Sequence, residues 1–436
     1  MKPQLTIQTP LQIPSSEIPS YLNQLWDEES TLNKGSNNFS LIIWQPAWLE
    51  QILVNTGKLK GPIVGYYRED VINIAREFIL KEGLPLSTFP LSKSLEKLLH
   101  KNYDQNHYSE DDLRGQYLHS SIGSLQPRRI ITLAPTYENS KKIDSFVSAF
   151  CPLIDINKTD VCGDLIGLRG GEEIIQDKGV SLIKNLIIED LPSWLWWDGS
   201  LDDSPEIFNK LIKFNNRIIF DTAFGEPKRS IDTLKKLIKT GKAVNDLNWL
   251  RLRSWREKIA IIFDPPHRRK ILLEIENIDI DIEGDHPIQA ILLSSWMAER
   301  LDWNFKQCSR ENDSVILLFT SNQNRSIKIS INSLQIGSPS IHQGKIVGLR
   351  IISNHGSDPK ENTCIILASK SFECMRLEAG GMANMQLIEE VVPDHIFTSE
   401  SEVSILLESS RGETSPLLES SIPIASEIFN KLIANT

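Results

Sequence analysis

Residues 190–200 read DLPSWLWWDGS and follow an apolar run from Val180 to Ile188. No other segment is so rich in aromatic side chains. If Ser193–Trp197 is a strand, its side chains alternate, so Trp194 and Trp196 lie on one face while Leu195 and Trp197 lie on the other. A strand that is apolar on both faces belongs in the middle of a sheet covered by helices. The stretch therefore predicts the hub of an α/β domain.

Two interpretations of the three tryptophans stay open at this point. Tryptophan is highly buried on average, which favours a role in the core of the sheet. Tryptophan is also enriched among the residues that dominate protein interfaces, which favours a role as a partner anchor. The sequence alone does not separate these interpretations.

The overall composition limits the classes of protein to consider. A chain of 436 residues with 40% hydrophobic content predicts two or three domains. The 47 basic and 57 acidic residues give a net charge of −10, which argues against a nucleic-acid or anionic-membrane binder. The N-terminus has no apolar signal segment and no later run would span a bilayer, so we expect a cytoplasmic protein. Five cysteines without a CxxC pair predict neither a disulfide scaffold nor a zinc cluster.

The N-terminal part of the chain predicts three elements of structure followed by an insertion. Residues 15–17 (SSE) can cap a helix with apolar positions at 18, 22, 25 and 26, and residues 38–45 (NFSLIIWQ) read as a strand, followed by a short helix from 48 to 53. The segment 57–112 then contains two helical patterns after the turn Gly61–Gly65. It resembles a peptidoglycan-binding-like three-helix module, in which this turn reads GPIDG; Val64 replaces the aspartate here. We interpret it as a helical spacer.

The remainder divides into two parts, which gives four segments in all: 1–56, 57–112, 113–270 and 271–436. In 113–270, strands alternate with helices, which predicts an α/β domain with a parallel or mixed sheet. One of these helices is expected from about 246 to 261. In 271–436, one long helix from 287 to 301 precedes a series of strands and two more helices, near 402–408 and 425–434. This order predicts an α+β domain whose sheet is mainly antiparallel. The strands expected there lie near residues 315–320, 327–331, 346–352, 364–369 and 375–378.

The sequence contains none of the common catalytic or cofactor-binding motifs considered below. The chain contains no glycine-rich phosphate or dinucleotide loop, no GxSxG elbow and no HExxH helix, and its eight histidines are scattered. We therefore predict no catalytic residue, no metal and no cofactor. The alternative is a sugar- or phosphosugar-metabolising enzyme in which the Gly170-Gly171 turn binds an anion. Asp198, Asp202 and Asp203 would supply its carboxylates, although the neighbouring Gly199 and Ser200 favour a solvated turn.

Four stretches taken together resemble one protein family. They are residues 128–131 (RRII) leading to Pro135-Thr136, the strand at 190–197, residues 263–269 (FDPPHRR) and residues 374–381 (CMRLEAGG). Their order and spacing are similar to the OpcA family of glucose-6-phosphate dehydrogenase assembly proteins, and the helical insertion is similar to its cyanobacterial branch. The resemblance implies a non-catalytic partner that promotes the active oligomer of the dehydrogenase. It would thereby raise the enzyme's activity and control entry to the oxidative pentose phosphate pathway.

The same stretches contain the expected contact and redox residues. The candidates for contact with the dehydrogenase are Trp194, Trp196, Trp197, Arg268, Arg269 and Arg376. The cyanobacterial pattern, which is associated with control by thioredoxin, has a cysteine six residues before the position of Cys374. Ala368 stands there in this chain. Cys364 is the remaining candidate to pair with Cys374, so thioredoxin is an expected further partner but redox control is expected to be weaker than the family pattern implies.

Overall fold

We describe the protein from a computed structural model. The structure describes residues 4–7, 11–27, 39–44, 122, 125, 127–136, 141–153, 162–188, 191–202, 204–311, 313–334, 344–353, 363–370, 374–381, 390–393, 399–409 and 413–434. The predicted module at 57–112 and the helix at 48–53 lie outside these residues. Two compact units divide the chain. The first contains Met1–Asp221, Gly241–Asn245 and Thr398–Glu413, and the second contains Thr222–Thr240, Asp246–Phe397 and Thr414–Thr436.

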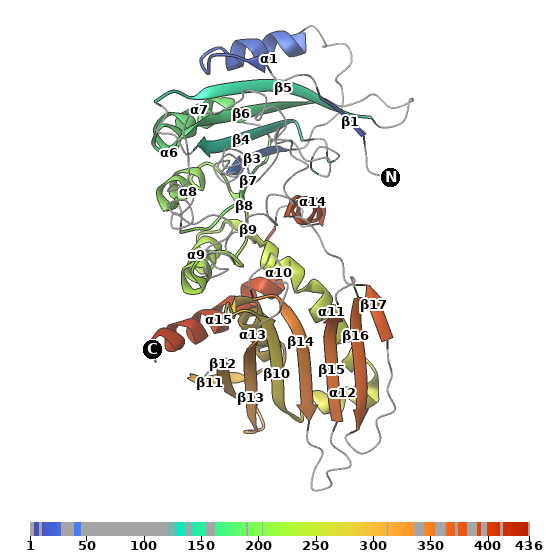
Figure 1. The fold of residues 1–436 in the computed structure, drawn as a ribbon. Helices are drawn as coiled ribbons and strands as arrows, with labels where there is room; N and C mark the ends of the chain where they lie inside the picture. The colour runs from blue at the N-terminus through green and yellow to red at the C-terminus, as the bar shows by residue number, and fades with distance from the viewer. Residues whose placement is uncertain are drawn as a thin grey trace. The chain divides into compact units, whose positions relative to one another are not determined.

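The first unit is built on a nine-stranded mixed sheet with the order β1-β5-β6-β4-β3-β7-β8-β9, in which β2 also pairs with β5 (Figure 1). The predicted hub strand, β7, lies between β3 and β8 and pairs in parallel with both. Its interior place explains why it is apolar on both faces. The strands are β1 (Gln4–Ile7), β2 (Leu11–Gln12), β3 (Ser40–Trp44), β4 (Arg129–Thr136), β5 (Asp144–Leu153), β6 (Gly163–Gly171), β7 (Ser193–Trp197), β8 (Arg217–Phe220) and β9 (Ala243–Asp246).

The order of the strands identifies the topology of this sheet. Strands β6, β4, β3, β7 and β8 are parallel, whereas β5 pairs with β6 in the antiparallel sense. With β5 set aside as an addition, the strands from β6 to β9 lie in the order third, second, first, fourth, fifth and sixth along the chain. This is the order of a doubly wound dinucleotide-binding sheet. Its ligand crevice lies at the carboxyl ends of the strands where the order reverses, which are β3 and β7 here.

Helices connect and cover the strands of the first unit. Helix α1 (Ile18–Asp27) lies beside β5 in Figure 1 and buries Ile18 and Leu22. The Ile13 N–H fixes the approach to α1 because it donates to the Ser145 carbonyl at 3.1 Å. Between β6 and β7, the chain forms α6 (Glu172–Ile174), a π-helical turn (Ile175–Gly179) and α7 (Val180–Leu186). Helices α8 (Pro205–Leu211) and α14 (Ser399–Ser409) complete the unit.

The second unit contains an eight-stranded sheet with the order β11-β12-β13-β10-β14-β15-β16-β17. Only β10 and β13 pair in parallel among the strand pairs of its described residues, so the predicted, mainly antiparallel sheet is confirmed. The strands are β10 (Ile275–Glu283), β11 (Asn304–Glu311), β12 (Ser314–Thr320), β13 (Ser326–Leu334), β14 (Ile346–Ser353), β15 (Thr363–Lys370), β16 (Cys374–Gly381) and β17 (Glu390–Pro393).

The helices of the second unit supply its core. Every residue of α13 from Ile288 to Ala298 is buried, and α15 packs beside it and against β11. The Lys431 ammonium group on α15 donates to the Lys306 carbonyl at 2.9 Å. No helix in the described part of the chain is long and apolar enough to cross a membrane. The helices are α9 (Pro227–Lys239), α10 (Leu247–Arg251), α11 (Arg253–Phe263), α12 (Pro266–Leu272), α13 (Ile288–Arg300) and α15 (Pro416–Ala434).

Candidate functional site

The carboxyl ends of β3 and β7, where a dinucleotide would lie, are occupied by two tryptophans. Trp44 and Trp197 are the last residues of these strands and stand opposite each other. Their rings stack with centroids 4.9 Å apart and planes within 6°, and both side chains are at most 1% exposed. Phe208 of α8 packs edge-on against Trp197 at 5.1 Å. This part of the crevice is therefore filled by protein side chains.

Backbone and indole hydrogen bonds hold the stacked pair in place. The Trp197 indole N–H donates to the Ser200 carbonyl at 3.1 Å, and the Asp198 N–H donates to the Trp44 carbonyl at 3.0 Å. The sequence directly after β3, 45–53 (QPAWLEQIL), contains no glycine. A dinucleotide site needs glycines there, so that the backbone can approach the pyrophosphate. The arrangement resembles a dinucleotide-binding sheet in topology but not in chemistry.

The other two tryptophans of β7 are also buried. Trp194 is 3% exposed and Trp196 is 2% exposed. The Arg217 guanidinium lies 5.6 Å from the centre of the Trp194 ring, a cation–π distance. This burial agrees with the core interpretation of the hub strand. The alternative role of Trp194, Trp196 and Trp197 as partner anchors stays a prediction, and it would require these side chains to become exposed.

Gly170 and Gly171, the predicted anion-binding turn, are buried residues at the end of β6, where they pair with Pro135 and Thr136 of β4. A Cβ at Gly170 would lie 2.8 Å from the Lys142 carbonyl oxygen and 2.9 Å from a methyl group of Ile174. Close packing therefore explains why glycine is required at residue 170. The pair does lead into helix α6, as predicted, but its backbone belongs to the strand ladder.

The carboxylates after β7 form a local turn. The Ser200 hydroxyl lies 3.3 Å from an Asp202 carboxylate oxygen and also accepts the Asp202 N–H at 3.1 Å. Asp203 lies outside the described residues. Within the described residues, no group of three or more histidine, cysteine, aspartate or glutamate side chains could hold a metal ion. Because Gly199, Ser200 and Leu201 are buried, this is a packed turn and not the solvated turn that the sequence favours.

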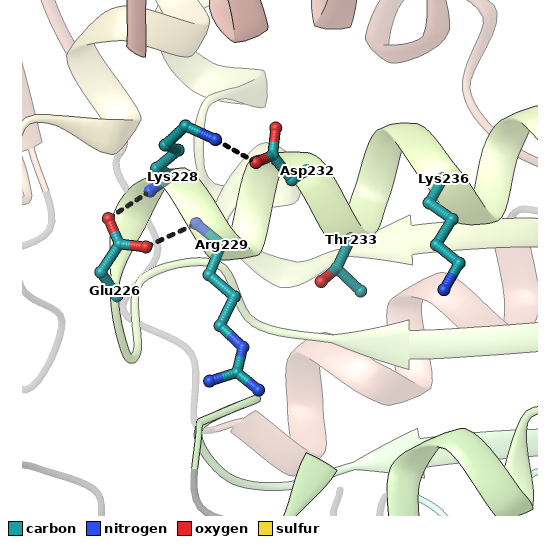
Figure 2. Close-up of a pocket in the computed structure, with 6 residues that line it drawn as sticks. All are labelled: Glu226, Lys228, Arg229, Asp232, Thr233 and Lys236. Atoms are coloured by element: carbon teal, nitrogen blue, oxygen red, sulfur yellow. Dashed lines mark hydrogen bonds and ion pairs between the residues drawn. The ribbon is translucent and has the colours of Figure 1, made fainter. Parts of the chain in front are cut away.

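A shallow hollow of about 330 Å³ lies along the start of α9 in the second unit (Figure 2). The Glu226 carboxylate caps this helix, accepting the N–H groups of Lys228 at 2.9 Å and Arg229 at 2.7 Å. Lys228 also pairs with Asp232, and Thr233 and Lys236 line the hollow farther along the helix. Because Glu226 already occupies the helix N-terminus, the hollow has no free backbone site of the kind that binds phosphate.

A buried polar network, which the sequence did not reveal, joins three elements of the second unit. The Asp246 carboxylate accepts the Thr222 N–H at 3.0 Å, the Thr222 hydroxyl at 2.8 Å and the Asn248 N–H at 3.1 Å. The Gln289 amide of α13 donates to Asn248 at 2.8 Å and accepts the Ile346 N–H of β14 at 2.8 Å. These side chains are at most 2% exposed. The network therefore ties α10, α13 and β14 together rather than forming an open site.

The predicted arginine contacts belong to the second unit. Arg269 on α12 is exposed, and its guanidinium group donates to the Asp264 carboxylate at 3.0 Å and to the Asp264 carbonyl at 2.7 Å. Arg376 lies on β16 opposite Ala368 and Val391. The side chains of Arg268 and Arg376 lie outside the described residues. A role in partner binding stays a prediction for all three arginines.

The register of β15 and β16 contradicts a bond between Cys364 and Cys374. The two strands are adjacent and antiparallel, but Cys364 stands opposite Gly380 while Cys374 stands opposite Lys370. The two rungs, at residues 364 and 370 of β15, are about 20 Å apart at a rise of roughly 3.3 Å per residue. A disulfide bridges Cα atoms less than about 7 Å apart. Cys308, by contrast, is a buried thiol that is not in a disulfide; it donates to the Ile428 carbonyl at 3.8 Å, and burial raises its pKa.

Comparison with known proteins identifies the family. Residues 119–236 match the family model for the N-terminal domain of a glucose-6-phosphate dehydrogenase subunit, and residues 242–421 match the model for its C-terminal domain. The chain belongs to the OpcA family. An OpcA protein of Synechococcus elongatus is 31% identical over 413 residues, with 92% of each chain covered. An OpcA protein of Nostoc punctiforme is 27% identical, with 97% of this chain and 95% of the relative covered. Both relatives are named as OxPP cycle proteins.

Solved structures are only distantly similar to this OpcA family member. A 3-ketoreductase from Actinomadura kijaniata, solved with NADP, has a TM-score of 0.40 and 10% identity, with 61% of this chain and 82% of that chain covered. An oxidoreductase from Sinorhizobium meliloti has a TM-score of 0.39 and 10% identity, with 59% and 81% covered. These TM-scores are too low to support an argument about activity.

Proposed function

We propose that this chain is a non-catalytic assembly factor and activator of glucose-6-phosphate dehydrogenase. It promotes the active oligomer of that enzyme in the oxidative pentose phosphate pathway, and it acts in the cytoplasm. The observation that carries the proposal is the match of both halves of the chain to domains of a glucose-6-phosphate dehydrogenase subunit. The association of its relatives with the OxPP cycle supports the same pathway.

The filled crevice supports the non-catalytic part of the proposal. A dehydrogenase must bind its nicotinamide cofactor before it can transfer a hydride. Trp44 and Trp197 are stacked at the carboxyl ends of the two strands where a dinucleotide-binding sheet holds that cofactor. The chain would therefore influence the reaction through contact with the enzyme.

The contact surface is proposed on the second unit, around the exposed Arg269 on α12. The Arg269 side chain is 62% exposed, and its guanidinium group can exchange Asp264 for a carboxylate of the dehydrogenase at little cost, because exposed ion pairs contribute about 0–1 kcal/mol. Arg268 and Arg376 stay candidates from the sequence. Trp194, Trp196 and Trp197 are left out of this surface because they are buried. A contact of thioredoxin with Cys364 and Cys374 is left out as well, because these two cysteines do not pair.

The test measures NADP⁺ reduction by glucose-6-phosphate with the purified chain, with the purified dehydrogenase and with both. We expect no turnover by the chain alone and a raised rate for the mixture. The variant Arg269→Glu should weaken the activation several-fold. Arg253→Glu is the matched control, because Arg253 is 59% exposed on the neighbouring helix α11 and pairs with Glu257 at 2.7 Å. Equal activation by both variants would exclude the Arg269 surface, and turnover by the chain alone would overturn the non-catalytic assignment.

A further inference from the structure

Cys162, just before β6 in the first unit, takes part in a disulfide bond and is partly exposed. The chain has five cysteines, of which Cys308 is not in a disulfide. Cys364 and Cys374 belong to β15 and β16 of the second unit, where they stand opposite Gly380 and Lys370. The remaining cysteine, Cys151, belongs to β5, the strand next to β6.

The β5–β6 register, continued by one residue beyond its last pair, aligns Cys151 with Cys162. In the β5–β6 pair, Ala149 stands opposite Asp164 and Phe150 stands opposite Gly163. One further step along this antiparallel ladder brings residue 151 opposite residue 162. Directly opposite Cα atoms in an antiparallel pair are about 4.5–5.5 Å apart. This separation falls within the range of about 4.4–6.8 Å that a disulfide spans.

The neighbouring rung fixes this alignment. A Cβ at Gly163 would lie 2.3 Å from the Pro127 carbonyl oxygen and 2.6 Å from the Phe150 ring. Only a glycine at residue 163 therefore leaves room for the Pro127 carbonyl and the Phe150 ring at the start of β6. On its other side, β5 pairs with β1, where Thr6 stands opposite Cys151. Residue 151 thus has a defined place in the interior of the sheet.

We propose that Cys151 and Cys162 form a disulfide that closes the β5–β6 hairpin and opens by exchange with a dithiol reductant. A thiolate of the reductant attacks the partly exposed Cys162 sulfur and releases the Cys151 thiolate, which takes up a proton. The second thiol of the reductant then breaks the mixed disulfide and releases Cys162 as a thiol. Two electrons and two protons pass from the dithiol to the cystine, and the reductant leaves as a disulfide.

Such a bond has a defined structural consequence. It cross-links the two ends of the segment 152–161, so opening it gives the unfolded chain more freedom and removes stability from the first unit. Disulfides in intracellular proteins are usually transient, with catalytic or redox-sensing roles. The redox site therefore lies in the first unit, far along the chain from the β15 and β16 cysteines that the sequence favoured.

The test counts thiols in the full chain. Iodoacetamide should label three cysteines in denatured protein without a reductant and all five after reduction. Peptide mapping without reduction should recover one cross-linked pair containing residues 151 and 162. The Cys162→Ser variant should show four reactive thiols both without and with reduction. The Cys374→Ser control should show two reactive thiols without reduction and four after it. Dithiothreitol should open the bond in the native protein and lower the melting temperature by about 5–10 °C.

Three results would overturn the proposal, and none of them depends on activation of the dehydrogenase. The first is labelling of Cys162 in denatured protein that has not been reduced. The second is a cross-linked peptide that joins Cys162 to any cysteine other than Cys151. The third is a bond that dithiothreitol opens only after the protein is unfolded, which would exclude exchange in the native state.

Discussion

Replacement of Trp197 by alanine should destabilise the first unit by about 5 kcal/mol. Truncation of a buried aromatic residue costs about 3–5 kcal/mol, and Trp197 is 0% exposed. The upper end applies because the change also removes the stack on Trp44 and the edge contact with Phe208. It also leaves the Ser200 carbonyl without the indole N–H, a loss of about 1 kcal/mol. At roughly 2–4 °C per kcal/mol, the melting transition of this unit should fall by about 10–20 °C.

Calorimetry of the full chain measures this shift, with the transition of each unit followed separately because a two-unit chain is not expected to unfold in one step. Trp197→Phe is the matched variant: it keeps a ring against Trp44 but loses the indole donor, so it should cost less than half as much. A double-mutant cycle with Trp44→Ala should show a coupling of about 1 kcal/mol. A Trp197→Ala transition within about 2–3 °C of the wild type, or strictly additive variants, would refute the packed crevice.

Three further predictions concern buried groups. Asp164→Asn should lower the free energy of unfolding, measured in urea, by about 3–4 kcal/mol, because the carboxylate is 0% exposed and pairs with Arg129 at 2.6 Å. As the control, Asp232→Asn removes an exposed carboxylate and should lower it by under about 1 kcal/mol. Asp246→Ala should lower the free energy of unfolding by about 2–4 kcal/mol in the same assay, because it leaves the buried Thr222 and Asn248 donors unpaired. An unchanged urea midpoint of unfolding would contradict the network. Native Cys308 should react with iodoacetamide at about pH 8 far more slowly than after unfolding, because burial raises its thiol pKa; equal rates would contradict this.

Local patterns predicted the centre of the first sheet but missed strands of the second. The alternation in Ser193–Trp197 indicated a strand covered on both faces, and β7 is interior to the sheet. Strand β10 carries an equally regular alternation, with Ile278 and Ile280 buried, yet it was not assigned. The helix predicted from 246 to 261 is a strand end followed by α10 and α11. A helix and a short strand joined by a capping aspartate give one continuous apolar pattern, and Asp246 is such a cap.

The C-terminal helix begins earlier than its sequence pattern predicts. The pattern predicts a helix near 425–434, but α15 runs from Pro416 to Ala434 through Pro423. Ile422 and Ala425 are both buried, so packing outweighs the loss of one backbone hydrogen bond. The domain boundary expected at residue 270 stays a prediction. The two compact units consist of segments that alternate along the chain, with divisions after Asp221, Thr240, Asn245, Phe397 and Glu413. Contacts between distant segments determine such divisions, and periodicity does not report them.

The candidate site depended on contacts that a sequence does not display. Trp44 and Trp197 are far apart in the chain and meet only because β3 and β7 are neighbours. The separation of Cys364 from Cys374 follows from the register of β15 and β16, which the spacing of the cysteines left open. The family, in contrast, followed from the order of four short motifs, and the matches to residues 119–236 and 242–421 confirm it.

Sedimentation velocity of this chain mixed with glucose-6-phosphate dehydrogenase from the same organism tests the central claim most directly. Each protein is run alone and the mixture is then run at several ratios, with enzyme activity measured across the boundary. We predict that the mixture forms a larger species than the dehydrogenase alone and that the larger species carries the raised activity. Independent sedimentation of the two proteins at every ratio, with an unchanged rate of NADP⁺ reduction, would contradict the account.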